Sequence, residues 1–322
     1  MQKRYKNMIK IGVSIDDNPV KEYLNLLTGE YPFLISGFSH SVNSKSYSPN
    51  RIRKNNSFIS LLENSNALLF LEGATPDPEK ISFALKKFKH VFLTNIPEVS
   101  EHKLMEFQKL ANEANVYLKA ANPLLYNPAY ISCKTDLQQA KFIEIKKKAE
   151  PKLRNHKDLE RSLSCDLEFI FMILKSNPKK IFSSGSFSHS DIPVYINTRI
   201  EFDNGASANI NYDFLQPKND HSATIHMAEK IYSLNFTNLK IQKNQLKNQT
   251  SPSNQITNQP VSLISKPINP GTQNPYHMEL KDFYESIAGK SEPVIIFEDS
   301  LMAQTVAKSI LNKIHIPKIS MV

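Results

Sequence analysis

The chain has 322 residues, of which 40% are hydrophobic, and this length and composition favour two domains that each bury a core. Its 40 lysines and arginines exceed its 31 acidic residues, for a formal charge of +9, but the basic residues are spread along the chain and form no nucleic-acid motif. Two cysteines make no disulfide framework, and no apolar run approaches a signal-peptide core or the roughly 20 residues of a membrane span. We therefore expect a cytoplasmic protein that binds neither nucleic acid nor membrane.

The first 120 residues alternate predicted strands with predicted helices. Strands are expected at residues 9–15, 33–38, 67–71, 91–93 and 116–120. The run at 67–71 is continuously apolar, which is typical of a strand buried on both faces of a parallel sheet. Strands joined by helices in this way predict a Rossmann-like, doubly wound parallel sheet over residues 1–122.

The first helix of this series has a recognisable start signal. Asn18 is an expected N-cap, and Pro19 suits the first helical position, where its missing N–H costs nothing. The predicted helix then continues to about Leu27. We expect further helices at residues 58–63 and 81–88 and after Ser100.

The pattern changes after Asn122-Pro123, where strands follow one another with fewer helices between them. Strands are expected at 142–147, 194–202, 206–214, 224–231 and 234–241, and helices at 159–174, 280–287 and 301–314. Asp203-Asn204-Gly205 predicts a hairpin, because Asn-Gly tolerates positive φ. Residues 242–260, which are rich in Asn, Gln, Ser and Pro, predict an exposed loop. Residues 123–322 are thus expected to form an α+β domain with a large open, mainly antiparallel sheet.

This layout resembles the Gfo/Idh/MocA oxidoreductases, which pair a Rossmann domain with an open-sheet domain. The matching segments are Ala84-Leu85 with Lys89-His90-Val91, Thr75-Pro76, Tyr126-Asn127-Pro128, the hairpin Phe202 to Ala206, and a C-terminal group from Pro275-Tyr276 and Glu279-Leu280 to Ala307. The resemblance covers almost the whole chain. It implies NAD or NADP as cofactor, a sugar, cyclitol or related polyol as substrate in the cleft between the domains, and homo-oligomers formed through the C-terminal sheet.

The loop that should hold the cofactor phosphates departs from the family. A G-x-G-x-x-G loop lets the backbone approach a pyrophosphate, but here the first strand leads into Ser14-Ile15-Asp16-Asp17-Asn18-Pro19, and Gly12 lies inside the strand. A carboxylate about 5 Å from a phosphate charge is repelled by about 3 kcal/mol at an effective dielectric near 20. Ser14, Asp16 and Asp17 therefore form either an ordinary capped turn or a site for a different ligand, such as a cation.

Other positions that the resemblance assigns to the cofactor are also altered. The second strand ends at Ser39-His40-Ser41 in place of the ribose-binding acid, and Ser39 is the candidate there. Further candidates follow the later strands: Thr75 and Pro76, Thr94 and Asn95, and Asn122. The family's catalytic lysine falls on Asn95, or on Ile96 if the following proline is matched, and neither residue is a general acid.

The family's catalytic Asp and His lie four residues apart on the long helix of the second domain. The resemblance places Ser162 at the Asp position and Asp166 at the His position, where Asp166 could accept a proton or make local hydrogen bonds. His156 is expected in the loop before that helix. His189, His221 and His226 show no metal-ligand spacing, so no metal is expected.

The altered positions leave two main hypotheses. In the first, the chain keeps the fold but has lost or much reduced dehydrogenase activity, and it binds an unknown small molecule or a partner protein through the cleft between the domains or through the open sheet. The cofactor is then either NAD or NADP, as the resemblance implies, or none. In the second, it is an active NAD(P)-dependent oxidoreductase with an atypical cofactor loop, in which Asn95, Asn122 or Asp166 is recruited for the chemistry. A third hypothesis is an assembly partner that stabilises an active homologue.

Overall fold

The computed structural model describes residues 8–16, 18–27, 33–40, 52–55, 57–73, 76–151, 155–188, 191–246 and 263–314. The chain divides into two compact units. The first contains Met1–Pro123 and Asn274–Leu301, and the second contains Leu124–Gln273 and Met302–Val322. The division differs from a single boundary at residue 122, because a segment from late in the chain packs into the first unit.

The first unit is built on a parallel sheet of five strands in the order β2-β1-β3-β4-β5. The strands are β1 (Lys10–Ile15), β2 (Leu34–His40), β3 (Ala67–Phe70), β4 (His90–Leu93) and β5 (Leu118–Ala120). All four residues of β3 are buried, as the apolar run predicted. The prediction of a Rossmann-like, doubly wound parallel sheet is confirmed.

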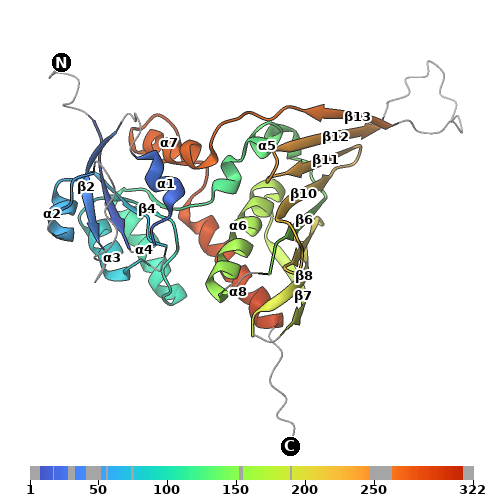
Figure 1. Cartoon of the computed structure of the whole chain (residues 1–322), viewed down its shortest axis with the longest axis horizontal. Coiled ribbons are helices and arrows are strands. Elements are labelled where there is room, and N and C mark those ends of the chain that lie inside the picture. Colours follow the sequence, from blue (N-terminus) through green and yellow to red (C-terminus); the bar gives the residue numbers. More distant parts are fainter. Residues whose placement is uncertain are drawn as a thin grey trace, which may run out of the picture. The chain divides into compact units, whose positions relative to one another are not determined.

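Helices cover both faces of this sheet and produce two cores (Figure 1). One core lies under α1 (Lys21–Leu26) and α7 (Pro275–Ile287), which contribute Tyr23, Leu280 and Phe283. The other lies under α2 (Phe58–Glu63), α3 (Pro78–Lys86) and α4 (Glu101–Ala114). The apolar stripe of α7 is therefore the reason that residues 274–301 belong to the first unit.

The start of α1 corrects a prediction. The N-cap is Val20, which makes no side-chain cap, so the expectation that Asn18 caps a helix beginning at Pro19 is wrong. The Asn18 N–H instead donates to Asp16 Oδ1 at 3.0 Å. An aspartate side chain commonly accepts from the backbone two residues later, and here that local turn takes the place of a helix cap.

The second unit is built on an eight-stranded sheet in the order β13-β12-β11-β10-β6-β9-β8-β7. The strands are β6 (Phe142–Lys148), β7 (Pro178–Phe187), β8 (Pro193–Phe202), β9 (Ser207–Asp213), β10 (Asp220–His226), β11 (Lys230–Asn235), β12 (Lys240–Leu246) and β13 (Leu263–Ile268). Only the β6–β9 pair is parallel. The predicted open, mainly antiparallel sheet is confirmed.

Two long helices lie together on this sheet. They are α6 (His156–Leu174) and α8 (Phe297–Ile314), which begins in the first unit. Gln304 Nε2 donates to Glu160 Oε1 at 3.1 Å, and Lys313 Nζ donates to the carbonyl of Ile181 at 2.8 Å. Shorter helical turns, η2 (Pro123–Tyr126), α5 (Pro128–Ile131) and η3 (Lys134–Leu137), precede β6.

The strand pattern of the second unit was only partly predicted. β7 and β13 were not expected, because β7 alternates half-buried with exposed residues and β13 is almost wholly exposed. β12 extends to Leu246, so residues 242–246 are a strand, and the rest of the predicted 242–260 loop lies outside the described residues. His156 is the first residue of α6 rather than part of the preceding loop.

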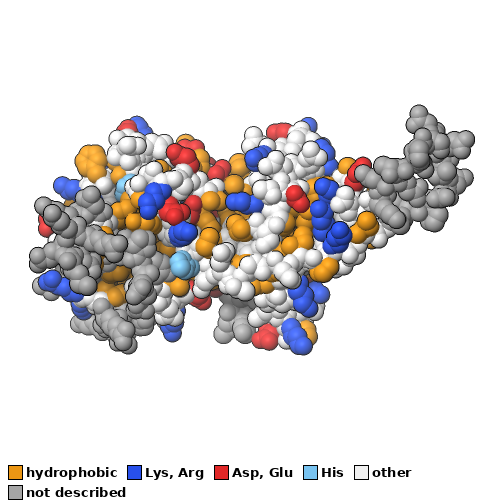
Figure 2. Space-filling model, turned by 90° about the horizontal axis from the view of Figure 1, so that it is seen from above, with side chains coloured by type: hydrophobic (Ala, Val, Ile, Leu, Met, Phe, Trp, Pro, Cys, Tyr) orange, Lys and Arg blue, Asp and Glu red, His pale blue; other side chains and the backbone are white. Residues whose placement is uncertain are grey.

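Two surface properties bear on the function classes considered above. No helix in the described ranges is long and apolar enough to cross a membrane. On the face shown in Figure 2, basic side chains stand singly or in small groups beside acidic ones. That face therefore carries mixed charge rather than one continuous basic surface.

Candidate functional site

The first candidate site is the switch point of the parallel sheet, where β2 and β3 lie on opposite sides of β1. In such sheets ligands bind in the crevice at the carboxyl ends of the two diverging strands. Here Ser14 Oγ, in β1, donates to Glu72 Oε1, just after β3, at 2.7 Å. Both side chains are buried. A direct hydrogen bond thus joins the two segments that would flank a bound dinucleotide.

The turn between β1 and α1 uses its own amides. The Asn18 N–H is bonded to Asp16, Pro19 has no N–H, and the Val20 N–H donates to the carbonyl of Leu71 at 2.9 Å. A Cβ atom built on Gly73 would lie 2.0 Å from the backbone oxygen of Asn18, so the segment after β3 presses against this turn. Three consecutive residues of the turn therefore offer no N–H to a phosphate.

Glu72 is the electrostatic centre of this crevice. Burial raises the pKa of its carboxyl from 4.5 to about 7, while the hydrogen bond from Ser14 and the charge of Lys80 act in the opposite direction. The negative charges of Asp16 and Asp77 raise it further. Near neutral pH the crevice therefore contains a carboxyl group that is close to half protonated, and its ionised form would repel a phosphate.

The residues after β4 are tied to the same segment. Asn95 Nδ2 donates to the carbonyls of Glu72 and Gly73 at 2.9 and 3.2 Å. Thr94 Oγ1 lies 2.9 Å from the carbonyl of Phe70 and 3.0 Å from that of Glu72. The predicted candidates Thr94, Asn95 and Ser14 are therefore brought together around Glu72, where they hold backbone and carboxyl groups of the protein.

The remaining cofactor candidates lie in different settings. Ser39 pairs with Ser14 across β1 and β2, and its buried Oγ has no hydrogen-bond partner among the described residues. Pro76 is buried just before α3. The backbone N–H of Asn122 donates to Glu279 Oε1 at 2.7 Å, and Tyr23 donates to the other oxygen of that carboxyl. Asp17 and Thr75, like Ser41 and His189, lie outside the described residues.

The second candidate site surrounds Asp166 on α6. The carboxyl group is fully buried: Tyr212, in β9, donates to Oδ2, and His221 Nε2, in β10, lies 2.9 Å from Oδ1. Ser162, one helical turn earlier, lies with its Oγ 3.4 Å from the Tyr212 hydroxyl and accepts from Lys147 Nζ. The two residues that the resemblance places at the catalytic positions therefore lie in one polar cluster.

The charges of this cluster set its protonation. Burial by itself would raise the pKa of Asp166, but the charges of His221 and Lys147 and the hydrogen bond from Tyr212 lower it below its usual range. Burial and the Asp166 charge raise the pKa of Tyr212 far above 10, so the phenol remains a donor. Asp166 is thus an anion that orients His221. The side chain of His221 is 18% exposed, and its Nε2 is buried against the Asp166 carboxylate.

Sequence reasoning missed three members of these sites. His221 and Tyr212 had no recognisable motif, because only the packing of β9 and β10 against α6 brings them to Asp166. Glu72 carried a usable signal, since a charged residue directly after a continuous apolar strand lies at the carboxyl edge of a parallel sheet. Within the described ranges, no cluster of three or more His, Cys, Asp or Glu residues is placed to hold a metal ion.

Comparison with known proteins shows similarity in fold rather than in sequence. No protein-family profile and no curated protein matches the chain. Among solved structures, UDP-N-acetylglucosamine 3-dehydrogenase GnnA from Acidithiobacillus ferrooxidans superposes with a TM-score of 0.82 at 14% identity, over 96% of this chain and 98% of that one. Dehydrogenase MviM from Clostridium difficile gives 0.76 at 17% identity, over 96% and 100%.

A third solved structure carries its ligands. Biliverdin reductase from Synechocystis, in complex with biliverdin and NADP+, superposes with a TM-score of 0.70 at 12% identity, over 95% of this chain and 99% of that one. These neighbours have the fold of NAD(P)-dependent oxidoreductases. The architecture is therefore shared along the whole chain, although few residues are identical.

Proposed function

We propose that this chain, which has the fold of the Gfo/Idh/MocA-type oxidoreductases, acts by binding a ligand or a partner and has lost or much reduced dehydrogenase activity. The observation that carries the proposal is the hydrogen bond of Ser14 to Glu72 across the switch point. A dinucleotide in the conventional position needs that crevice open and the amides of the β1–α1 turn unoccupied.

Two physical costs oppose a bound pyrophosphate. The Val20 N–H would have to leave the Leu71 carbonyl, and an N–H or carbonyl that loses its partner in a buried setting costs about 1–3 kcal/mol. Asp16, and Glu72 when ionised, would each repel the phosphates by up to about 3 kcal/mol at close range. Since each 1.4 kcal/mol is roughly tenfold in affinity, the sum moves a micromolar cofactor site to millimolar or weaker.

The test is a titration of the full chain with NADH and NADPH, followed by nicotinamide fluorescence and by the thermal midpoint. We expect no saturable change up to millimolar cofactor. The Asp16→Asn variant is a useful companion, because it removes one negative charge while keeping an oxygen acceptor for the Asn18 amide. Saturation of the parent chain at micromolar NADH or NADPH would refute the proposal.

A specific observation favours a second candidate function, an active NAD(P)-dependent oxidoreductase with an atypical cofactor loop. His221 is held by the buried anion of Asp166, so the second unit contains an Asp–His pair although the family positions hold Ser162 and Asp166. A histidine held in this way can give or take the proton that accompanies hydride transfer to a nicotinamide. In this alternative the cofactor would be NAD or NADP, and the substrate a sugar or related polyol.

This alternative is tested with UDP-N-acetylglucosamine, the substrate class named for the similar GnnA protein, and either nicotinamide cofactor. The alternative is supported if the parent chain turns over the substrate and if this rate falls at least about a hundredfold in His221→Gln, because general acid–base catalysis contributes about 10²–10⁴-fold. Asn238→Asp, at an exposed site elsewhere in the second unit, is the matched control. If His221→Gln leaves the turnover unchanged, the Asp166–His221 pair takes no part in the chemistry.

Assembly remains a separate prediction. The resemblance favours a homo-oligomer formed through the eight-stranded sheet, and the third hypothesis requires a different, active homologue as the partner. Light scattering of the purified chain distinguishes them. A stable homodimer supports the predicted homo-oligomer and argues against the need for a different protein as partner.

A further inference from the structure

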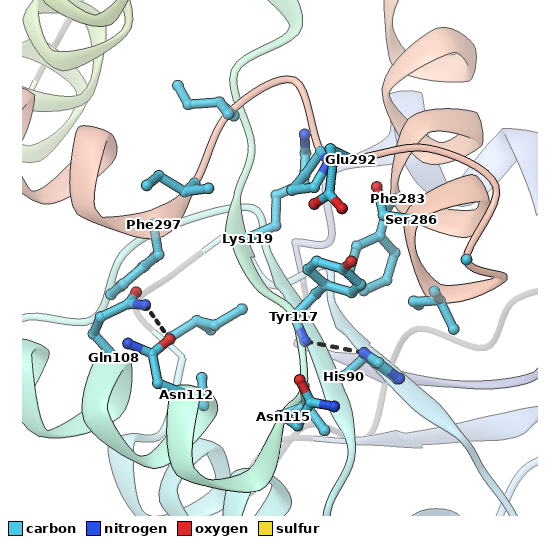
Figure 3. A pocket seen from close by; sticks show the side chains of 18 residues that line it. His90, Gln108, Asn112, Asn115, Tyr117, Lys119, Phe283, Ser286, Glu292 and Phe297 are labelled. Carbon is cyan, nitrogen blue, oxygen red and sulfur yellow. Dashed lines mark hydrogen bonds between the residues drawn. The ribbon is translucent and has the colours of Figure 1, made fainter.

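A cavity of about 640 Å³ lies in the first unit at the amino-terminal ends of β4 and β5 (Figure 3). His90 is the first residue of β4, and Tyr117 immediately precedes β5. Ser14, Glu72 and Asn95 lie at the carboxyl ends of the strands, so this cavity is at the other end of the same sheet. Its volume falls in the range of small-molecule pockets.

The polar wall of the cavity is a stripe of carboxamides. Gln108, Asn112 and Asn115 follow one another at spacings of four and three along α4 and its C-cap, so they share one helix face. Gln108 Nε2 donates to Asn112 Oδ1 at 2.8 Å. Gln108 Oε1 is sealed from solvent without a hydrogen-bond partner among the described residues. A buried acceptor without a partner is a group that the donor of a ligand would satisfy.

The opposite side of the cavity is aromatic. The rings of His90 and Tyr117 stack with their centroids 5.6 Å apart and their planes 23° apart, and the Tyr117 N–H donates to His90 Nδ1 at 3.0 Å. Burial lowers the pKa of His90 to about 4, so the imidazole is neutral. Because Nδ1 accepts, the single proton of the neutral ring is on Nε2, which makes His90 a donor of fixed tautomer.

The charges at the cavity are unfavourable for an anion. Lys119 lies 3.0 Å from Asp282, and both side chains are almost fully buried, so this ammonium group is already neutralised. The carboxylate of Glu292 also lines the cavity. The side chains that line the cavity are therefore carboxamides, a neutral imidazole and aromatic rings, together with a carboxylate that would repel a phosphate.

We propose that this cavity binds the base of a nucleoside, a planar and uncharged heteroaromatic ring. A carboxamide presents a donor and an acceptor side by side, which matches the edge of a base, and aromatic rings stack on its face. The ribose then extends toward solvent, and any phosphate remains outside the cavity. The inference goes beyond the proposed function and does not depend on it, because the two sites share no residue.

The experiment is calorimetric titration of the full chain with adenosine, guanosine, cytidine and uridine, and with N-acetylglucosamine as a polar ligand without an aromatic ring. We expect saturable binding of at least one nucleoside and none of the sugar. Gln108→Leu should weaken that binding roughly tenfold, the effect of losing one hydrogen bond worth about 1.4 kcal/mol. Gln139→Leu, at an exposed glutamine of the second unit, should bind as the parent does.

A second variant keeps the test decisive if Gln108→Leu does not fold. Tyr117→Leu removes the stacked ring but keeps the backbone N–H of residue 117, which donates to His90 Nδ1. This variant too should weaken nucleoside binding roughly tenfold. The inference is overturned if no nucleoside binds at millimolar concentration, if the sugar binds equally well, or if folded Gln108→Leu or Tyr117→Leu binds as tightly as the parent. Because a nicotinamide cofactor also carries an adenine base, the NADH and NADPH titration is repeated with Gln108→Leu. Cofactor binding that this variant abolishes belongs to the cavity, and cofactor binding that it leaves unchanged belongs to the crevice at Glu72, so the two proposals fail separately.

Discussion

At the scale of single residues, Glu72 fills the crevice at the switch point of the parallel sheet. Its carboxyl accepts from Ser14, and its backbone carbonyl accepts from Asn95. A buried carboxyl with a pKa of about 7 is also a cost to folding above that pH, since the folded state must then contain a charge that burial has removed from water. The residue therefore ties the ends of β1, β3 and β4 together at an electrostatic penalty.

Replacing Glu72 with glutamine should reveal that penalty. Because the folded pKa is raised from 4.5 to about 7, the folded chain holds the proton more tightly, and stability falls as pH rises between these values. Glu72→Gln keeps an acceptor for Ser14 and should raise the free energy of unfolding by about 3 kcal/mol above pH 7, with little change below about pH 4.5. Urea denaturation at both pH values measures this. Parallel stability–pH profiles for parent and variant would contradict it.

Gly73 has a steric rather than a chemical role. Its added Cβ would lie 2.0 Å from the Asn18 backbone oxygen, and a backbone atom cannot swing aside as a side-chain tip can. We expect Gly73→Ala to lower the free energy of unfolding by about 1–3 kcal/mol. Gly271→Ala is the matched control, because its Cβ would meet nothing closer than 3.6 Å, and it should stay within about 0.5 kcal/mol of the parent. Equal stabilities of the two variants would show that the turn can yield.

At the scale of elements, the β8–β9 hairpin is anchored to the end of α6. Gly205, at φ +77°, makes the predicted turn. Asn204 Nδ2 donates to the Leu174 carbonyl at 3.0 Å, and its Oδ1 accepts from the Ala206 N–H at 3.0 Å. One carboxamide thus closes the hairpin and satisfies a carbonyl at the helix C-terminus.

The Asn204→Asp variant separates these two roles. The carboxylate can still accept from Ala206, but it cannot donate to Leu174, and it brings negative charge to the negative end of a helix. A loss of about 1–2 kcal/mol in the free energy of unfolding is expected. Asn238→Asp, at an exposed turn position, should change it by less than about 0.5 kcal/mol. If both variants unfold alike, the hairpin does not depend on the Leu174 contact.

At the scale of the whole molecule, the chain returns to its first unit after completing the eight-stranded sheet. α7 contributes Leu280 and Phe283 to the core that also contains Tyr23 and Phe92. Glu279 on the same helix is fully buried, and its carboxyl accepts from Tyr23 and from the Asn122 N–H. The first unit is therefore complete only with residues 274–301.

A fragment of residues 1–123 should consequently fail to form the native first unit. Losing α7 removes Leu280 and Phe283 from the core on one face of the sheet, so the fragment should lack the near-ultraviolet circular dichroism of packed aromatic rings. Adding a peptide of residues 274–301 should restore part of that signal. A fragment that unfolds cooperatively by itself would show that α7 is dispensable.

The sequence by itself determined the class of the fold and showed that the glycines of a phosphate-binding loop are absent. Strand and helix periodicities are local, so the parallel series before residue 122, the later antiparallel strands and the Asn204-Gly205 hairpin followed from patterns within a few residues. The absence of glycines between Ile15 and Pro19 was equally visible. The strands β7 and β13 could not be predicted, because their residues are mostly half-buried or exposed and so show no clear apolar alternation.

Only the tertiary structure decided which side chains meet. Ser14 and Glu72 are 58 positions apart, and Asp166 and Tyr212 are 46 apart, so neither pair leaves a mark in the local pattern. The same holds for the start of α1. There the Asn18 N–H donates to Asp16 and the Val20 N–H donates to the carbonyl of Leu71, and these contacts replace the helix cap expected at Asn18. Such contacts depend on how strands and helices pack, and packing joins residues whose spacing carries no period.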